Sequence, residues 1–235
     1  MKTLLALVVF LFAFVAAPSI SLAQENSPAP EFKLVEFQMA LLKRGPKWSP
    51  TGMPKEVQSA HLANVMSLLE SGKATVAGPL GDEGDILGIY IFRAKSADEA
   101  KTWAESDPAV KAEFLVAEMH PWWSEDITKK AATPLKLTTV YLGLLTRGEK
   151  WTPEKTPATE ELQKAHLENI KRLADTKKLV LAGPFGDDGQ LRGIFIFRVG
   201  SLEEAKELAA TDPAIKAGRL AIEIHPWMVP EGTLP

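Results

Sequence analysis

The stretch AGPLGDEGDILGIYIFR at residues 77–93 returns almost unchanged as AGPFGDDGQLRGIFIFR at residues 182–198. Self-similarity at a fixed offset is the signature of a duplicated structural unit. The same offset of about 105 residues relates HLANVMSLLE at 61–70 to HLENIKRLAD at 166–175, DPAVKA at 107–112 to DPAIKA at 212–217, and EMHPWW at 118–123 to EIHPWM at 223–228. The chain therefore contains one unit twice.

The two copies differ by a small insertion near their beginnings. LLKRGPKW at 41–48 matches LLTRGEKW at 144–151 at an offset about two residues shorter. Each copy has roughly 90 residues, which is the size of a domain. We divide the chain into a leader (1–23), a flexible N-terminus (24–34), repeat 1 (35–123), a polar linker (124–136), repeat 2 (137–228) and a C-terminal tail (229–235).

Each unit has a readable order of elements, and repeat 1 illustrates it. The pattern predicts a strand over 35–43, a helix over 54–71, strands over 73–77 and 87–92, a helix from residue 96 and a last strand over 115–120. Ser96 and Glu99 have the spacing of a capping box. The second helix ends at Asp107, because the proline that follows disfavours helical geometry there. The order is βαββαβ, the ferredoxin-like unit of the α+β class.

The strands are apolar on both faces, which decides how the units pack. IYIF at 89–92 and IFIF at 194–197 do not alternate with polar residues, as strands with one solvated face do. Two helices cover only one face of such a sheet. We expect the sister sheet to cover the other, so that the units form an intramolecular pseudo-dimer. Residues 24–128 expressed alone should then dimerise or be insoluble.

Composition excludes several classes of protein. The chain has 235 residues, of which 46% are hydrophobic and 24% charged, a balance typical of a packed protein and not of a disordered one. It has no cysteine, which excludes disulfides, zinc–thiolate sites and a lipidated cysteine. The formal charge of −3 and the lack of a basic stripe argue against binding to nucleic acid.

The first residues have the pattern of a secretory signal peptide. Lys2 supplies the positive charge, the segment 4–17 is an almost unbroken apolar run, and Ser21-Leu22-Ala23 provides small residues before a cleavage site at Gln24. The alternative is a membrane anchor, but the run is short for a bilayer span of roughly 20 residues. We therefore expect a protein exported to the periplasm or the medium, without membrane attachment once the leader is cleaved.

Two of the four histidines are candidates for chemistry. His61 and His166 have apolar residues four positions before and after them, so each points with the apolar stripe of its helix toward the sheet. Asp107 and Asp212 are the natural partners, since a carboxylate fixes the imidazole tautomer and leaves the other nitrogen free for proton transfer. The alternatives are a core histidine whose role is structural and an Asp-Pro pair that only caps a short helix.

The remaining polar motifs have simpler interpretations. His120 and His225 end a strand before Pro-Trp, and we expect local hydrogen bonds for them. Their spacing does not support a metal site. The acidic loop at 81–85 lacks the ligand pattern of an EF-hand and is interpreted as a solvated hairpin turn. Arg44 and Arg147, at strand ends before glycine, are either surface charges or contacts for an anionic substrate.

The chain resembles the YCII-related domain family. The resemblance is carried in both repeats by Ala-His-Leu on the first helix, Ala-Gly-Pro after the second strand, Ser-x-x-Glu-Ala in the second helix, and Asp-Pro. It implies a dimeric α+β barrel, in which two ferredoxin-like units join through their sheets. It also implies relatives such as muconolactone isomerase and a chlorohydroxyhydroquinone dehydrochlorinase. The family's catalytic His–Asp pair would fall on His61 with Asp107 and on His166 with Asp212.

Two hypotheses about function follow. The first is an exported isomerase-like or lyase-like enzyme that binds a small organic molecule and transfers a proton through the His–Asp pairs, with no metal or cofactor. The second is a non-catalytic module of the same fold that binds a small ligand or is structural. Oligomers beyond the intramolecular pair remain open under both hypotheses.

Overall fold

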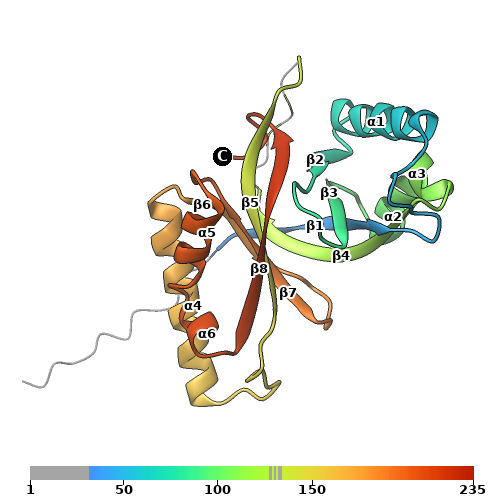
Figure 1. The fold of residues 1–235 in the computed structure, drawn as a ribbon. Coiled ribbons are helices and arrows are strands. Elements are labelled where there is room, and N and C mark those ends of the chain that lie inside the picture. The colour runs from blue at the N-terminus through green and yellow to red at the C-terminus, as the bar shows by residue number, and fades with distance from the viewer. Residues whose placement is uncertain (1–31, 127–128, 130, 132–133) are drawn as a thin grey trace, which may run out of the picture.

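The computed structural model describes residues 32–126, 129, 131 and 134–235 (Figure 1). The predicted signal peptide and most of the predicted flexible N-terminus lie outside the described residues. None of the helices in the described part is both long and apolar enough to cross a membrane.

Repeat 1 has the predicted βαββαβ order with one additional short helix. Its elements are β1 (Leu34–Arg44), α1 (Lys55–Glu70), β2 (Ala74–Pro79), β3 (Ile86–Phe92), α2 (Ala97–Glu105), α3 (Pro108–Lys111) and β4 (Leu115–Glu125). Its strands form an antiparallel sheet in the order β2-β3-β1-β4. This order follows from the split βαββαβ connectivity, which places the first strand between the third and the fourth.

Repeat 2 has the same architecture. Its elements are β5 (Leu137–Arg147), α4 (Pro157–Asp175), β6 (Leu179–Pro184), β7 (Leu191–Phe197), α5 (Leu202–Ala209), α6 (Pro213–Lys216) and β8 (Leu220–Pro230). The sheet order β6-β7-β5-β8 repeats that of the first sheet. The α+β class and the tandem ferredoxin-like organisation are therefore confirmed.

Local capping explains where the short helices begin. The Ser96 hydroxyl accepts from the Glu99 N–H at 3.2 Å, as predicted. The Glu99 carboxylate accepts from the N–H of Lys95, one residue before the expected partner, so only half of the capping box is present. Asp107 caps α3 through the Ala109 N–H and is followed by proline at the first helical position.

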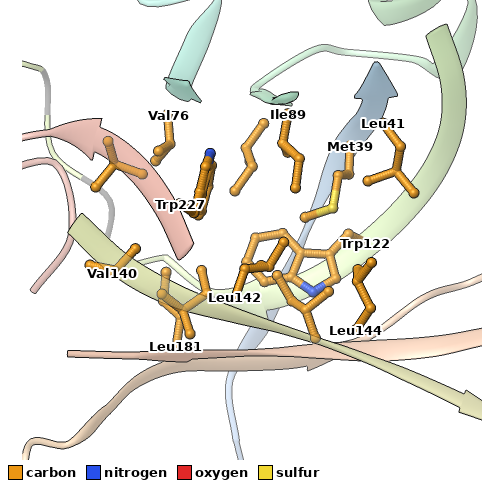
Figure 2. Packing of buried hydrophobic residues seen from close by; sticks show 14 of the residues in the cluster. Met39, Leu41, Val76, Ile89, Trp122, Val140, Leu142, Leu144, Leu181 and Trp227 are labelled. Carbon is orange, nitrogen blue, oxygen red and sulfur yellow. The ribbon is translucent and has the colours of Figure 1, made fainter. Parts of the chain in front are cut away.

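The two sheets pack face to face inside one chain. In Figure 1 the helices of the two repeats lie on opposite outer sides, with the strands between them. One apolar cluster joins both sheets, and Figure 2 shows part of it. Its buried members include Met39, Leu41, Val76, Ile89 and Trp122 from repeat 1 and Val140, Leu142, Leu144, Leu181 and Trp227 from repeat 2. The predicted pseudo-dimer is confirmed, and its cause is the second apolar face of each sheet.

The free edges of the sheets also meet, and this closes the barrel. β4 lies beside β6, and β8 lies beside β2. The Trp122 indole N–H donates to the Gly183 carbonyl at 3.2 Å, and the Trp227 indole N–H donates to the Gly78 carbonyl at 3.1 Å. The two junctions that close the barrel are therefore held by the same contact, an indole N–H of one repeat donating to a glycine carbonyl of the other.

Two glycines are required at this junction. A Cβ atom on Gly78 would lie 1.7 Å from the Met228 carbonyl oxygen, and one on Gly183 would lie 1.8 Å from that of Trp123. The close approach of the strands therefore depends on the absence of a side chain at both positions.

The predicted end of the last strand at His120 was wrong. β4 continues to Glu125, so the predicted linker begins inside the strand, and β8 likewise continues to Pro230, inside the predicted tail. The predicted strand ended at the residue before Pro121. On an edge strand a proline is tolerated, and here its carbonyl accepts from the Gly186 N–H of the sister repeat at 2.7 Å.

Candidate functional site

The candidate site lies on the outer face of each sheet, beneath the long helix. In repeat 1 a cavity of about 360 Å³ lies between α1 and β3. His61 lines it together with Trp48, Gln58, Leu87 and Tyr90. This volume is within the range of small-molecule sites, and the lining is mostly apolar with a few polar groups.

The predicted pairing of His61 with Asp107 is present. The Nδ1 atom of His61 lies 2.9 Å from each carboxylate oxygen of Asp107. The carboxylate is fully buried and also accepts from the Asn64 amide at 3.0 Å, the Tyr90 hydroxyl at 2.7 Å and the Ala109 N–H at 2.8 Å. Four donors from α1, β3 and α3 thus hold one carboxylate in place.

This environment fixes the charge state of Asp107 and the tautomer of His61. Burial alone would raise the pKa of Asp107, but the hydrogen bond and the charge of His61, together with hydrogen bonds from Tyr90 and the Ala109 N–H, outweigh burial and hold the pKa below its usual value. Burial, together with the charge of Asp107, raises the pKa of Tyr90 far above its usual range, so that its hydroxyl remains a donor.

Because an ionised carboxylate only accepts hydrogen bonds, Nδ1 of His61 carries the proton that faces Asp107. In neutral His61 the Nε2 atom then holds a lone pair. No contact of Nε2 with a described residue competes for that lone pair, and the ring lines the cavity. This is the arrangement that a general base requires.

Repeat 2 has the same pair, and its carboxylate also has four donors, none of which is a hydroxyl. Nδ1 of His166 lies 2.8 Å from Asp212, which also accepts from the Asn169 amide at 3.4 Å, the Ala214 N–H at 2.8 Å and the Ile215 N–H at 3.3 Å. Phe195 occupies the position of Tyr90 and stacks on the His166 ring, with centroids 5.9 Å apart. The buried Asp212 therefore lacks the hydroxyl contact that Asp107 receives.

The cavity of repeat 2, about 320 Å³, differs in its lining. Arg192 stands where repeat 1 has Leu87, and its side chain lies against Trp151. Leu34 and Glu125 of the first sheet, and Phe32 just before β1, also line this cavity, whereas the described lining of the repeat 1 cavity comes from repeat 1 alone. The sister sites thus share the His–Asp pair but not their surroundings.

Arg44 and Arg147 lie outside both cavities. The Arg44 guanidinium contacts the Asp85 carboxylate at 3.4 Å and the Glu83 carbonyl at 3.2 Å. That of Arg147 contacts the Asp188 carboxylate at 2.7 Å. Each arginine is therefore held by the acidic turn of its own repeat, and the predicted contact with a substrate stays a prediction.

His120 of β4 and His225 of β8 join the two repeats. Nδ1 of His120 lies 2.6 Å from Asp187, and Nδ1 of His225 lies 2.6 Å from Asp82. The local hydrogen bond predicted for these histidines forms at His120, whose Nε2 atom lies 2.9 Å from Glu118, whereas Nε2 of His225 lies 3.7 Å from Glu223, too far for a hydrogen bond.

The interpretation of the acidic loop as a solvated turn was therefore incomplete. The sheet-to-sheet packing brings the acidic turn of each repeat against the last strand of the other. Asp187 contacts His120 there, and Asp82 contacts His225. Within the described ranges no group of three or more His, Asp and Glu side chains is placed to hold a metal ion. The expectation of a site without metal or cofactor stays a prediction.

Sequence reasoning missed three contributors to the site. Asn64 and Asn169 follow the helix histidine by three residues in both repeats, which places them on the same helix face. Tyr90 is the one hydroxyl in an apolar strand, and a buried hydroxyl needs a partner. Arg192 breaks the apolar pattern at the start of a strand in which repeat 1 has Leu87 at that position. Comparing the repeats position by position would have found all of them.

The fold and the paired sites define a class of protein, the dimeric α+β barrel built here from two halves of one chain. Sequence comparison then identifies the family. The YCII-related domain matches residues 47–122 and again residues 146–228, and the chain belongs to that family.

Comparison with individual proteins agrees with this assignment. The uncharacterized protein YjpA of Bacillus subtilis (strain 168) is 33% identical over 87 residues, which is 37% of this chain and 92% of that protein. It therefore corresponds to about one repeat.

Solved structures resemble the whole tandem. A chlorite dismutase variant from Candidatus Nitrospira defluvii matches with a TM-score of 0.55 and 14% identity, over 83% of this chain and 90% of that one. A heme-binding protein from Thermus thermophilus matches with a TM-score of 0.50 and 14% identity, over 86% and 94% of the two chains. At this identity the likeness shows the fold alone.

Proposed function

We propose that this protein is exported and binds a small organic molecule in the cavity of each repeat, where the His–Asp pair transfers a proton. The observation that carries the proposal is the orientation of His61. Its Nδ1 atom is anchored by a buried, ionised carboxylate, and its ring lines a cavity of about 360 Å³. His166 repeats this arrangement in the second cavity.

The proposed chemistry is an isomerisation or an elimination. Nε2 of His61 removes a proton from a carbon atom next to an electron-withdrawing group, and the imidazolium that forms is stabilised by Asp107. In an isomerisation the same proton returns to a different atom of the ligand. In an elimination the electron pair of the broken C–H bond forms a double bond while a leaving group departs. The apolar lining strengthens the interaction between imidazolium and carboxylate.

Export is supported by the residues at the start of the chain. The charge at Lys2, the apolar run over 4–17 and the small residues at 21–23 have the order of a cleavable leader. Mass spectrometry of the protein recovered from the periplasm or the medium tests this part. We expect a mature chain that begins at Gln24, and a full-length chain retained in the cytoplasm would contradict it.

A second candidate is a non-catalytic module, and one observation favours it. Asp107 accepts hydrogen bonds from α1, β3 and α3 at once, so it fastens these three elements together whether or not any proton is transferred. A buried carboxylate with all its donors satisfied is also a normal structural feature. The two candidates therefore differ in what His61 does, and an experiment on the histidines separates them.

The test is a ligand screen followed by an exchange measurement. A library of small cyclic and aromatic carbonyl compounds is screened by thermal shift on the wild-type protein and on the His61→Ala/His166→Ala variant. We expect ligands that stabilise the wild type more than the variant. Ligands that stabilise both proteins equally would place the site elsewhere.

Proton transfer itself is followed by NMR in D₂O. The wild type should incorporate deuterium into a bound ligand, and the double variant should not. Binding without histidine-dependent exchange would favour the non-catalytic candidate. The control is the variant Lys171→Leu. In the wild type Lys171 is exposed and paired with Asp175 on α4, and it lines neither cavity.

A further inference from the structure

The two cavities differ most at the end of the repeat 2 cavity that Trp151 and Arg192 line. Three guanidinium groups surround the Trp151 ring there, those of Arg147, Arg192 and Arg219, at 5.4, 4.8 and 4.6 Å from its centroid. Stacking on an indole orients a guanidinium and removes part of its water, which prepares its N–H groups for a planar anion. Trp151 and Arg192 line the cavity itself.

This positive charge is only partly compensated. Within the described part of the chain, Asp188 is the one carboxylate paired with any of the three arginines, and its side chain is 94% exposed. It lies 2.7 Å from Arg147 but 3.5 Å from Arg192. Arg219 has a hydrogen bond to the Thr152 hydroxyl and no ion pair with a described residue. The Arg192 guanidinium has only long contacts, at 3.4 Å to the Asp187 carbonyl and 3.5 Å to the Asp188 carboxylate. Its donors are therefore available to a ligand in the cavity.

Repeat 1 provides an internal comparison. The positions of Arg192 and Arg219 are occupied by Leu87 and Phe114, while the tryptophan is kept as Trp48. Trp48 and Leu87 line the repeat 1 cavity, so its corresponding end is apolar. The His–Asp pair is common to both cavities, and therefore it does not account for this difference.

We infer that the repeat 2 cavity binds a small organic anion, such as a carboxylate on a flat apolar ring, and that the repeat 1 cavity does not. The ring would pack on the apolar lining, and the carboxylate would bind Arg192, which Trp151 orients. This inference rests on the proposed function, because it assigns the ligand class of one of the same two cavities.

One negative group also lines the repeat 2 cavity. Glu125 belongs to β4 and lines this cavity. Its place relative to Arg192 follows from two backbone contacts: Trp122 is bridged to Phe185, and the Phe185 N–H donates to the Arg192 carbonyl. Glu125 lies three residues beyond Trp122 on the same strand. Three strand residues span roughly 10 Å, so the backbone of Glu125 lies about that far along the barrel from the level of Arg192. The ends of the cavity therefore carry opposite charges, which orients an anion with its carboxylate toward Arg192.

The test measures binding of benzoate and of benzyl alcohol to the wild-type protein by calorimetry. The two probes share the ring and differ in charge. We expect one benzoate site per chain, and weaker binding by roughly tenfold or more in Arg192→Leu, since a charged hydrogen bond is lost. Binding of benzyl alcohol should change little. Leucine is the residue of repeat 1 at this position, so the variant should fold, which circular dichroism checks.

Two further variants control the result. Lys171→Leu removes one positive charge from α4 away from the cavity and should bind benzoate as the wild type does. Arg192→Lys keeps the charge but loses the planar fork, and should bind several-fold more weakly than wild type. Absence of benzoate binding, two equivalent sites, or equal binding by wild type and Arg192→Leu would overturn the inference.

The outcomes also separate this inference from the proposed function. If benzoate binding depends on Arg192 but no ligand shows histidine-dependent deuterium exchange, the anion site stands and the proton transfer fails. If exchange depends on the histidines but benzoate binding is indifferent to Arg192, the proton transfer stands and the anion site fails.

Discussion

Replacing Tyr90 by phenylalanine should destabilise repeat 1 without opening a cavity. The hydroxyl donates at 2.7 Å to a carboxylate that is fully buried, and the ring is 1% exposed. A hydrogen bond to a charged group contributes about 1.5–3 kcal/mol, so we expect a loss of about 2 kcal/mol in the free energy of unfolding. For a chain of this size that corresponds to a fall of about 4–8 °C in Tm. Phenylalanine already fits at the equivalent position, as Phe195.

The assay is urea unfolding followed by circular dichroism, with Tyr141→Phe as the matched control. The Tyr141 hydroxyl makes no hydrogen bond to a described residue, so its loss should stay within about 0.5 kcal/mol. We also expect the free energy of unfolding to depend on pH. The lowered pKa of Asp107 stabilises the protein above the usual value of 3.8, and this contribution is lost as the pH falls through the pKa of the folded state.

Without the Tyr90 hydroxyl the pKa of Asp107 rises toward 3.8. The difference between the wild type and Tyr90→Phe should therefore be largest at neutral pH and should narrow in acid. A Tyr90→Phe variant as stable as the wild type at pH 7 would refute the reasoning, and so would a difference that grows in acid.

Three other changes have expected outcomes. Because the pKa of Tyr90 is raised, its neutral form stabilises the fold below the usual value of 10.0, and stability should fall as the pH rises above that value. This alkaline loss of stability should be weaker in Tyr90→Phe. If the urea midpoint depends on pH in the same way in the variant and the wild type, the expectation is wrong. Gly183→Ala places a Cβ atom 1.8 Å from the Trp123 carbonyl and should cost at least about 1–3 kcal/mol, measured by urea unfolding, whereas Gly200→Ala, with its nearest atom at 3.8 Å, should be nearly neutral. Residues 24–128 alone should dimerise or be insoluble, and a stable monomer in light scattering would contradict the shared core.

Periodicity and repetition predicted the fold because both are local signals. IYIF at 89–92 and IFIF at 194–197 are apolar on both faces of the strand, and that pattern alone requires a second sheet. The helix position of His61 likewise follows from spacing, and its pairing with Asp107 is present in the structure. The catalytic role of the pair is a question of chemistry that spacing does not answer.

Contacts between the repeats could not be predicted in the same way. The bond from His120 to Asp187 depends on the register of one sheet against the other, which no spacing within a repeat encodes. The continuation of β4 beyond Pro121 has a different origin, since its residues pair with the first residues of β1 in the same repeat, and Trp122 is bridged to Phe185 of the other. Arg192 has no signal within its own repeat, and only the comparison with Leu87 at the equivalent position of repeat 1 reveals it.

The covalent tandem has a consequence for how the two cavities can diverge. In a dimer of identical chains every mutation appears twice, so a substitution that suits one ligand alters both sites together. Here Leu87 and Arg192 occupy one position of the unit but are encoded separately. One cavity can therefore change its specificity while the lining of the other stays the same, and each molecule always contains one of each kind. Fusion converts a symmetric pair into a heterodimer with fixed stoichiometry.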